Sequence, residues 1–329
     1  MSKFVDSATT AHTLSLMAME EASRFGQRTA DIDHMFLALT VNEQPAGQVL
    51  RGLGITLEAA REAVAAQHAA QLASLGITAE QPQGKIVFHE TGGYTWGERP
   101  IEIIKRAGAG EKRGDASAVL RELVIEPSGM IEEVLERLGT TPRAVLDRLD
   151  EVERLPMRPP QVKVDPASLS GTSETFVPAA VSEVWALLSD PARMPEWDQT
   201  IGSVEASSLA ETMEVGAAWT THAPTRRPDG KPIRVKPQWS VQRVELLACE
   251  PEELLEWRLS YPSPKSNTRR VRIELEPAAG GTQLRIAFGW ERGQGRRRSI
   301  RGWLMRPVYR LMIWMQLSTL GTGISRAFR

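Results

Sequence analysis

Apolar residues in the first 150 positions recur three or four residues apart, which is the spacing of amphipathic helices. The clearest early run consists of Ala11, Leu14, Ala18, Ala22 and Phe25. Gly26 follows this run, and glycine is common just after a helix, so we expect a first helix that ends near Arg24. Three further helices are expected over 33–40, 45–54 and 56–72, because Asp, Pro and Thr stand at their first positions.

A ten-residue pattern occurs twice in this half of the chain. The segment Gln48–Leu57, QVLRGLGITL, returns as Glu133–Pro142, EVLERLGTTP. Each copy ends a helix at a glycine and provides a capping threonine, Thr56 or Thr141, for the next helix. Internal similarity at a fixed offset is typical of repeated units. We therefore predict a tandem repeat of a four-helix module.

Two segments interrupt the helical pattern. Residues 76–97 are rich in turn formers, so we interpret them as a loop between the two copies. Prolines crowd the stretch around 155–166 and favour an extended spacer over a helix. We predict a helical domain over 1–153, a proline-rich linker over 154–171 and a second domain over 172–329.

Beyond the linker, the apolar spacing changes from helical to alternating. Val271, Ile273 and Leu275 alternate with charged residues, as expected for half-buried antiparallel strands. A second strand of this kind covers 284–290, with a glycine-rich turn over 277–282 between the two. The same pattern predicts strands over 216–223, 239–247 and 254–261. Helices are expected over 182–188 and after Ser299.

Composition narrows the class of protein without identifying it. The net charge is −1, and Cys249 is the single cysteine, so disulfides and thiolate metal clusters are not expected. The five histidines are scattered, and none of them forms a helical metal-binding pair with another. The first residues lack the features of a signal peptide. We therefore expect a cytoplasmic protein with no metal, no cofactor and no transmembrane segment.

The first half resembles the duplicated amino-terminal domain of Clp-type AAA+ chaperones. The resemblance rests on the segments Phe4–Ala8, Met19–Ala22, Ile32–Leu39 and Val49–Gly54. The second copy departs from the family pattern, because Ala118 stands where His34 stands in the first. The resemblance implies an all-α domain that docks a peptide, an adaptor or the Clp machinery.

The residues expected to form a peptide groove in this domain are Phe4 and Trp96, which we place at equivalent first helices of the two copies. The ATPase modules of such chaperones are not expected in this chain. Neither Gly108–Gly110 nor Gly293–Gly295 is followed by the lysine and hydroxyl of a phosphate-binding loop.

The second half is similar to the polyketide-cyclase and lipid-transport branch of the START-like (SRPBCC) superfamily. The segments that carry this similarity are Glu174–Pro191, Pro195–Asp198 and Gly280–Leu284. The resemblance implies a helix-grip fold, in which a bent antiparallel sheet wraps a long C-terminal helix around an apolar cavity. It also implies an apolar small molecule or lipid as the ligand.

Tryptophan is concentrated in this second half, which contains eight of the nine in the chain. Large side chains of this kind either fill a bent sheet or line a ligand pocket. Our candidates for the lining of the pocket are Trp219, Trp239, Trp257, Phe288, Trp290, Trp303, Met312 and Met315.

Few residues are candidates for chemistry. His222, Asp198, Tyr261 and Glu291 could act as acids or bases in the second domain, but none forms a recognisable pair or triad. We therefore assign no catalytic residue. The basic run Arg296–Arg298 attracts phosphate in principle, but no aromatic stacking platform accompanies it, so a nucleic-acid partner is not expected.

The sequence thus favours a binding protein without ATPase activity, in which the helical repeat docks a protein or peptide and the second domain binds an apolar molecule. Two alternatives remain open. One is an enzyme of the polyketide cyclase or aromatase type, with the helical repeat as its scaffold. The other is a stress or antibiotic-sequestering protein related to Clp chaperones.

Overall fold

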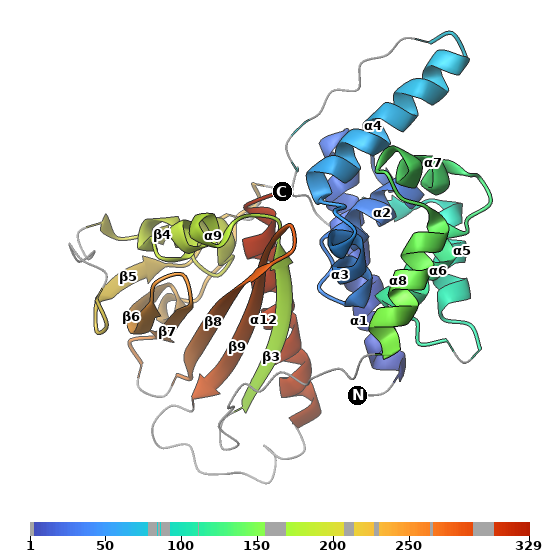
Figure 1. Ribbon diagram of the computed structural model, residues 1–329. Helices are drawn as coiled ribbons and strands as arrows, with labels where there is room; N and C mark the ends of the chain where they lie inside the picture. Colours follow the sequence, from blue (N-terminus) through green and yellow to red (C-terminus); the bar gives the residue numbers. More distant parts are fainter. Residues whose placement is uncertain are drawn as a thin grey trace. The chain divides into compact units, whose positions relative to one another are not determined.

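The computed structural model divides the chain into two compact units, Met1–Arg158 and Pro159–Arg329 (Figure 1). The structure describes residues 3–77, 84, 86, 93–110, 112–154, 169–206, 214–226, 230–263, 266–291 and 306–329. The expected linker over 154–171 contains the division between the units, and most of it lies outside these ranges. None of the described helices is both long and apolar enough to cross a membrane.

Eight described helices make up the first unit, four in each half. Their bounds are α1 Lys3–Arg24, α2 Ile32–Thr40, α3 Pro45–Gly52, α4 Leu57–Ser74, α5 Glu98–Ala107, α6 Ala116–Val124, α7 Met130–Arg137 and α8 Pro142–Arg154. The strands β1 Thr29–Ala30 and β2 Thr95–Trp96 form a short parallel pair. The expected helix ends at Arg24 and near Gly54 are confirmed.

The two halves match in the lengths of their second and third helices and in the threonine caps of their fourth, whereas their first and fourth helices differ in length. Helices α2 and α6 each have nine residues, and α3 and α7 each have eight. Thr56 and Thr141 each accept a backbone hydrogen bond at 3.2 Å from the residue three positions later. Gly54 and Gly139 adopt left-handed conformations, with φ of 81° and 75°. Each half thus contains four helices in the same order, which is consistent with the repeat predicted from the sequence.

Asp33 does not cap α2, contrary to our expectation. Asp31 is the N-cap residue, and its carboxylate accepts a hydrogen bond from the Ile32 backbone N–H at 2.8 Å. His34 occupies the third position of the helix and completes the capping box, and Ala118 occupies the same position of α6. Asp33 is instead buried, as is every residue of α2, so this helix forms the centre of the first unit.

The second unit contains a seven-stranded antiparallel sheet in the order β3-β9-β8-β7-β6-β5-β4. Its strands are β3 Leu169–Val177, β4 Ser203–Val204, β5 Ala218–His222, β6 Val241–Glu250, β7 Leu254–Ser260, β8 Thr268–Ala278 and β9 Gly281–Glu291. The two longest, β8 and β9, stay paired down to Ala278 and Gly281, so a tight turn joins them as predicted.

Helices α9 Val181–Leu188, α10 Met194–Trp197 and α12 Arg306–Arg326 accompany this sheet. Helix α12 packs along β3 and also contacts β9 and α10 (Figure 1). Two glycines of α12 permit this close approach. A Cβ on Gly321 would lie 2.1 Å from Thr175 Oγ1, and one on Gly323 would lie 2.2 Å from the Trp197 carbonyl oxygen. The expected long C-terminal helix is confirmed.

Candidate functional site

The core of the second unit lies between one face of the sheet and the three helices α9, α10 and α12. Residues of four neighbouring strands stand directly opposite one another on this face, namely Leu246, Trp257, Val271 and Phe288. All four are buried. Because side chains of a strand alternate between faces, this row and every second residue from it mark the inner face of the sheet, and the intervening positions face outward.

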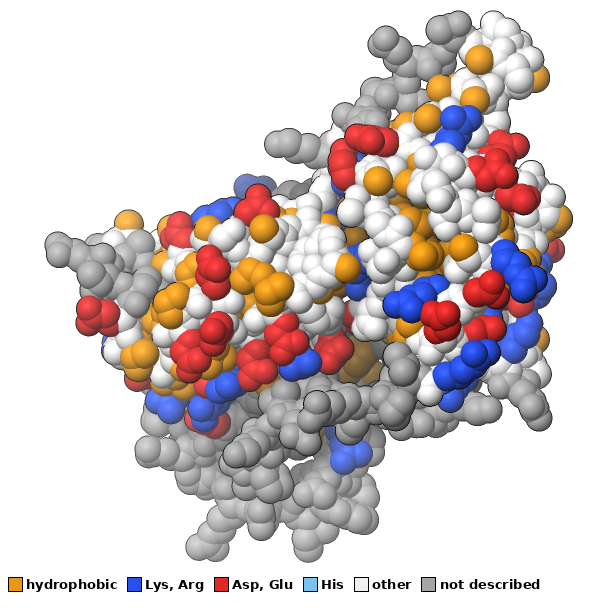
Figure 2. Space-filling model, viewed as in Figure 1, with side chains coloured by type: hydrophobic (Ala, Val, Ile, Leu, Met, Phe, Trp, Pro, Cys, Tyr) orange, Lys and Arg blue, Asp and Glu red, His pale blue; other side chains and the backbone are white. Residues whose placement is uncertain are grey.

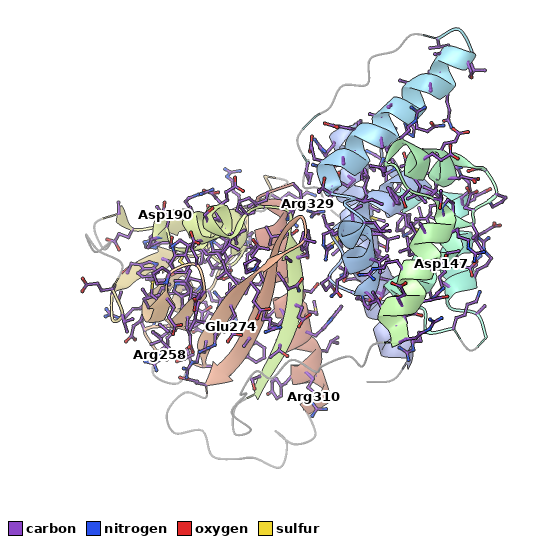
Figure 3. All side chains as sticks on the ribbon, in the orientation of Figure 1. Asp147, Asp190, Arg258, Glu274, Arg310 and Arg329 are labelled. Atoms are coloured by element: carbon purple, nitrogen blue, oxygen red, sulfur yellow. The ribbon has the colours of Figure 1, made fainter. Side chains whose placement is uncertain are left out.

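The outer face is charged. Glu256 pairs with Arg270 and Arg272, and Arg285 pairs with Glu276 at 2.7 Å. Figure 3 shows side chains such as Arg258 and Glu274 on these strands, and acidic and basic groups lie next to one another on the face that Figure 2 presents. The two faces therefore differ sharply, and the inner one is the candidate site.

Three of the predicted pocket residues, Trp219, Trp257 and Phe288, lie on the inner face and are at most 2% exposed. Trp290 is half-buried beside them, and its ring meets that of Phe288 edge to face with 5.6 Å between the ring centroids. Trp303 lies outside the described residues. Four of the eight candidates therefore lie in or against this core.

Trp239, Met312 and Met315 do not face the interior, contrary to our expectation. Their exposed fractions are 44%, 45% and 54%. Trp239 belongs to a 3-10 turn that precedes β6, and the Lys236 ammonium lies 5.3 Å from the centre of its ring. The two methionines lie on the outward side of α12, because the buried side of that helix is formed by Ile313, Leu317, Leu320 and Ile324.

Trp197 is part of the site but was not among our pocket candidates. It ends α10, is 2% exposed, and its ring lies 5.6 Å from that of Trp257 at an angle of 41°. The sequence did contain a signal, since Trp197 belongs to the segment Pro195–Asp198 that carries the START-like resemblance. The alternation of apolar and polar residues could not reveal Trp197, because that pattern identifies strands and Trp197 lies on a short helix.

A polar corner adjoins this aromatic core. Asp198 accepts a hydrogen bond from Arg269 Nη2 at 2.5 Å, and two further bonds from the backbone N–H and the hydroxyl of Thr200 at 2.9 and 2.7 Å. Arg269 also donates to the Thr200 hydroxyl at 3.0 Å. Burial raises the pKa of the nearby Tyr261, so its phenol stays protonated near neutral pH.

Several buried polar atoms of the second unit have no hydrogen-bond partner among the described residues. Trp197 Nε1, Trp219 Nε1 and Thr221 Oγ1 lie around the aromatic core, and Ser173 Oγ, Arg269 Nε, Gln283 Nε2 and Ser325 Oγ are further examples. Thr221 is fully buried. Most buried polar groups in proteins are hydrogen-bonded, so three unpartnered atoms in one core require an explanation.

The other candidates for chemistry lie away from this core. His222 is two positions from Thr220 and shares its face of β5, opposite to that of Trp219 and Thr221. The Glu291 side chain is 40% exposed, and its carboxylate oxygens lie 3.7 Å from Arg270 Nη1 and 3.9 Å from Arg258 Nε. Within the described ranges, no three His, Cys, Asp or Glu side chains form a cluster that could hold a metal ion.

In the helical unit, Trp96 is half-buried in β2, two residues before α5 begins at Glu98, and its Nε1 donates to Ser15 Oγ at 2.9 Å. Phe4 lies in α1, but its side chain is outside the description. The structure thus places Trp96 against the first helix of the first copy, rather than within the first helix of the second.

Asp33 is a polar centre of the helical unit that sequence reasoning took for a cap. Its carboxylate lies 2.8 Å from His34 Nδ1 and 3.1 Å from His68 Nε2. Burial alone would raise the pKa of Asp33, but the neighbouring His34 and His68 outweigh this effect and lower that pKa well below its ordinary value. Asp33 also accepts a hydrogen bond from the His34 backbone N–H at 2.8 Å, so it is an ionised group with several partners.

Residues 168–313 match the family described as polyketide cyclase / dehydrase and lipid transport. Several solved structures are similar to the chain. One is a protein from Chromobacterium violaceum, with 15% identity, 47% of this chain and 96% of that one covered, and a TM-score of 0.31.

A second is a polyketide-cyclase-like protein of Corynebacterium glutamicum, with 20% identity, 50% of this chain and 92% of that one covered, and a TM-score of 0.33. A third is a START superfamily protein of Mycobacterium smegmatis, with 14% identity, 48% of this chain and 94% of that one covered, and a TM-score of 0.33. No curated protein matches the chain.

Proposed function

We propose that the second unit, whose residues 168–313 form a START-like domain of the polyketide cyclase / dehydrase and lipid transport family, binds an apolar small molecule in its interior. The observation that carries the proposal is the aromatic lining of the inner face. Trp219, Trp257 and Phe288 come from three different strands, and Trp197 faces them from α10.

Aromatic rings suit this role because they offer large, rigid apolar surfaces at low entropic cost. The strands that carry the rings are paired with their neighbours in continuous register. Trp197 and Trp257 already contact each other in a tilted arrangement. A flat apolar molecule can contact such rings through its face or its edge.

Native mass spectrometry of the chain purified from its own host tests this proposal, followed by denaturation to identify any released molecule. We expect a released apolar compound, and quenching of tryptophan fluorescence when the empty chain is titrated with it. Trp257→Leu should weaken that binding, whereas Trp239→Leu, at an exposed position, should leave it unchanged. A chain that is empty and insensitive to a lipid and aromatic library would refute the proposal.

One observation favours a second function, that of a cyclase or aromatase. The phenol of Tyr261 is half-buried beside the Arg269–Asp198 pair, and a phenol in such a place can donate a hydrogen bond to a carbonyl oxygen of a polyketide. Incubation with a linear poly-β-ketone should then release water and a cyclised product. Tyr261→Phe should slow this reaction at least tenfold without weakening binding, and a failure to form product would exclude this function.

For the helical unit, we propose docking of a protein or peptide partner, as the resemblance to Clp amino-terminal domains suggests. The duplicated four-helix arrangement supports this proposal. Phe4 and Trp96 are the residues that we expect to contact the partner. Capture of a labelled unfolded polypeptide should decrease in Phe4→Ala and Trp96→Ala. Trp96→Phe is the control that retains a ring but loses the bond to Ser15, and unchanged capture in all three variants would rule out this groove.

A further inference from the structure

We infer that the ligand of the second unit carries a carbonyl oxygen, which accepts hydrogen bonds from the indole N–H groups of Trp219 and Trp197. This inference rests on the proposed function and specifies the chemistry of the bound molecule. It distinguishes a ketone or quinone from a plain hydrocarbon of the same shape.

Two buried indole N–H groups determine what the ligand must offer. Trp219 and Trp197 are each 2% exposed, and their Nε1 atoms have no acceptor among the described residues. An indole N–H can only donate a hydrogen bond. Leaving such a donor unpaired in an apolar interior is costly, so each indole favours an acceptor beyond the described residues, and a bound ligand can supply one.

These donors come from adjoining elements of the second unit. Trp219 and Thr221 lie two positions apart on β5 and share its inner face. Val204 of β4 stands opposite Thr221, and α10, which Trp197 ends, packs against β4. The two indoles and the Thr221 hydroxyl thus belong to one end of the core.

The buried charges at this end of the core are balanced. Arg269 is paired with Asp198, so the two buried charges cancel, and Tyr261 is protonated. Arg269 Nε is a further buried donor without a partner in the described part of the chain. A carboxylate would be buried here without a countercharge of its own, which is unfavourable. A neutral oxygen acceptor satisfies the donors without that cost, and a carbonyl is the simplest such group.

A matched pair of probes tests the inference on the full chain: 9-fluorenone and fluorene. The two share one flat tricyclic skeleton and differ by a carbonyl in place of a methylene group. We expect 9-fluorenone to bind about tenfold more tightly in the wild-type protein, as measured by quenching of tryptophan fluorescence. In Trp219→Phe and Trp197→Phe the ratio of the two affinities should fall severalfold towards one, whatever the change in the affinity for fluorene itself.

Trp239→Phe serves as the control, because it makes the same chemical change at a ring that is 44% exposed and should leave the preference intact. Thr221→Val provides a second conservative variant of the site, and near-ultraviolet circular dichroism verifies that each variant is folded. Equal affinity for both probes would overturn the inference and leave the proposed function standing. If Trp239→Phe lost the preference for 9-fluorenone as much as Trp219→Phe and Trp197→Phe, that result would also overturn the inference. If neither probe binds, the proposed function and this inference both fail.

Discussion

The two units treat their buried polar groups in opposite ways. In the helical unit, Glu21 is wholly buried and makes two hydrogen bonds with Arg61, at 2.8 and 3.0 Å. Arg51 donates to two backbone carbonyls, and Asp33 is held by two histidines. Asn42 Nδ2 is the exception, since it has no partner in the described part of the chain.

In the second unit, by contrast, two indoles, a threonine hydroxyl and further buried side-chain atoms lack partners in the part of the chain that the structure describes. A fully paired interior is suited to a single stable packing, because each polar group is satisfied only in the native arrangement. An interior with unsatisfied donors sacrifices stability, and such sacrifices are typical of binding sites. The paired interior of the first unit thus favours one fixed packing, and the unsatisfied donors of the second unit support the ligand binding that we propose for it.

The largest effect should come from breaking the buried ion pair of the helical unit. Glu21→Ala leaves the buried Arg61 guanidinium without its buried partner and with only the exposed Glu58 carboxylate nearby, which should cost about 3–5 kcal/mol of unfolding free energy in that unit. Hydrogen exchange of α1 and α4 measures the loss without interference from the second unit. Glu58→Ala is the control, because Glu58 is 72% exposed and lies 3.7 Å from the same arginine. A cost below 1 kcal/mol for Glu21→Ala would contradict our account of this pair.

The next effect concerns Asp33 and depends on pH. Its pKa is lowered in the folded state, so its ionised form stabilises the unit above the unfolded pKa of about 3.9. That stabilisation decreases as the pH falls below this value. Asp33→Asn should therefore cost about 2–3 kcal/mol at pH 7, and less at pH 3. Hydrogen exchange of α2 at both pH values measures it, and Asp147→Asn, at an exposed carboxylate, should show no such dependence.

A smaller effect tests how the second unit holds its site. Gly323→Ala places a Cβ against the Trp197 carbonyl oxygen and should force α10 away from α12, at a cost of about 1–3 kcal/mol and with loss of ligand binding. Gly52→Ala is the matched change in the helical unit, where nothing lies within 4 Å of the new Cβ. It should be neutral or slightly stabilising. Equal unfolding midpoints for the two variants would show that the contact at Gly323 is unimportant.

Sequence reasoning was most successful where the chemistry is local. Thr56 and Thr141 were predicted as caps, because capping depends on residues a few positions apart. Alternation likewise located the strands that carry Trp257 and Phe288. It failed at Trp239, because Pro237 begins a 3-10 turn just before β6 and interrupts the alternation.

Other features could not be predicted, because they depend on contacts distant in the sequence. Asp31 and Asp33 are equally good caps by type, and only packing against His68 of α4 determines which of the two is buried. Met312 and Met315 were misplaced because α12 carries apolar residues on all sides, so its buried face is decided by β3. The pairing of Asp198 with Arg269 joins residues 71 positions apart.

The smallest effect compares the two interiors at a single hydroxyl each. Thr221 Oγ1 lacks a partner among the described residues, whereas Thr40 Oγ1, equally buried, donates to the Leu37 carbonyl at 2.7 Å. Valine has nearly the shape of threonine, so Thr→Val removes the hydroxyl alone. Thr40→Val should cost about 0.5–1.5 kcal/mol, because a buried hydrogen bond is lost. Thr221→Val should be neutral or stabilising in the ligand-free protein, because an unsatisfied group is removed. Thermal unfolding and hydrogen exchange of β5 and α2 measure both. A clear loss of stability in ligand-free Thr221→Val would mean that this hydroxyl is already satisfied, and the contrast between the two interiors would then disappear at this position.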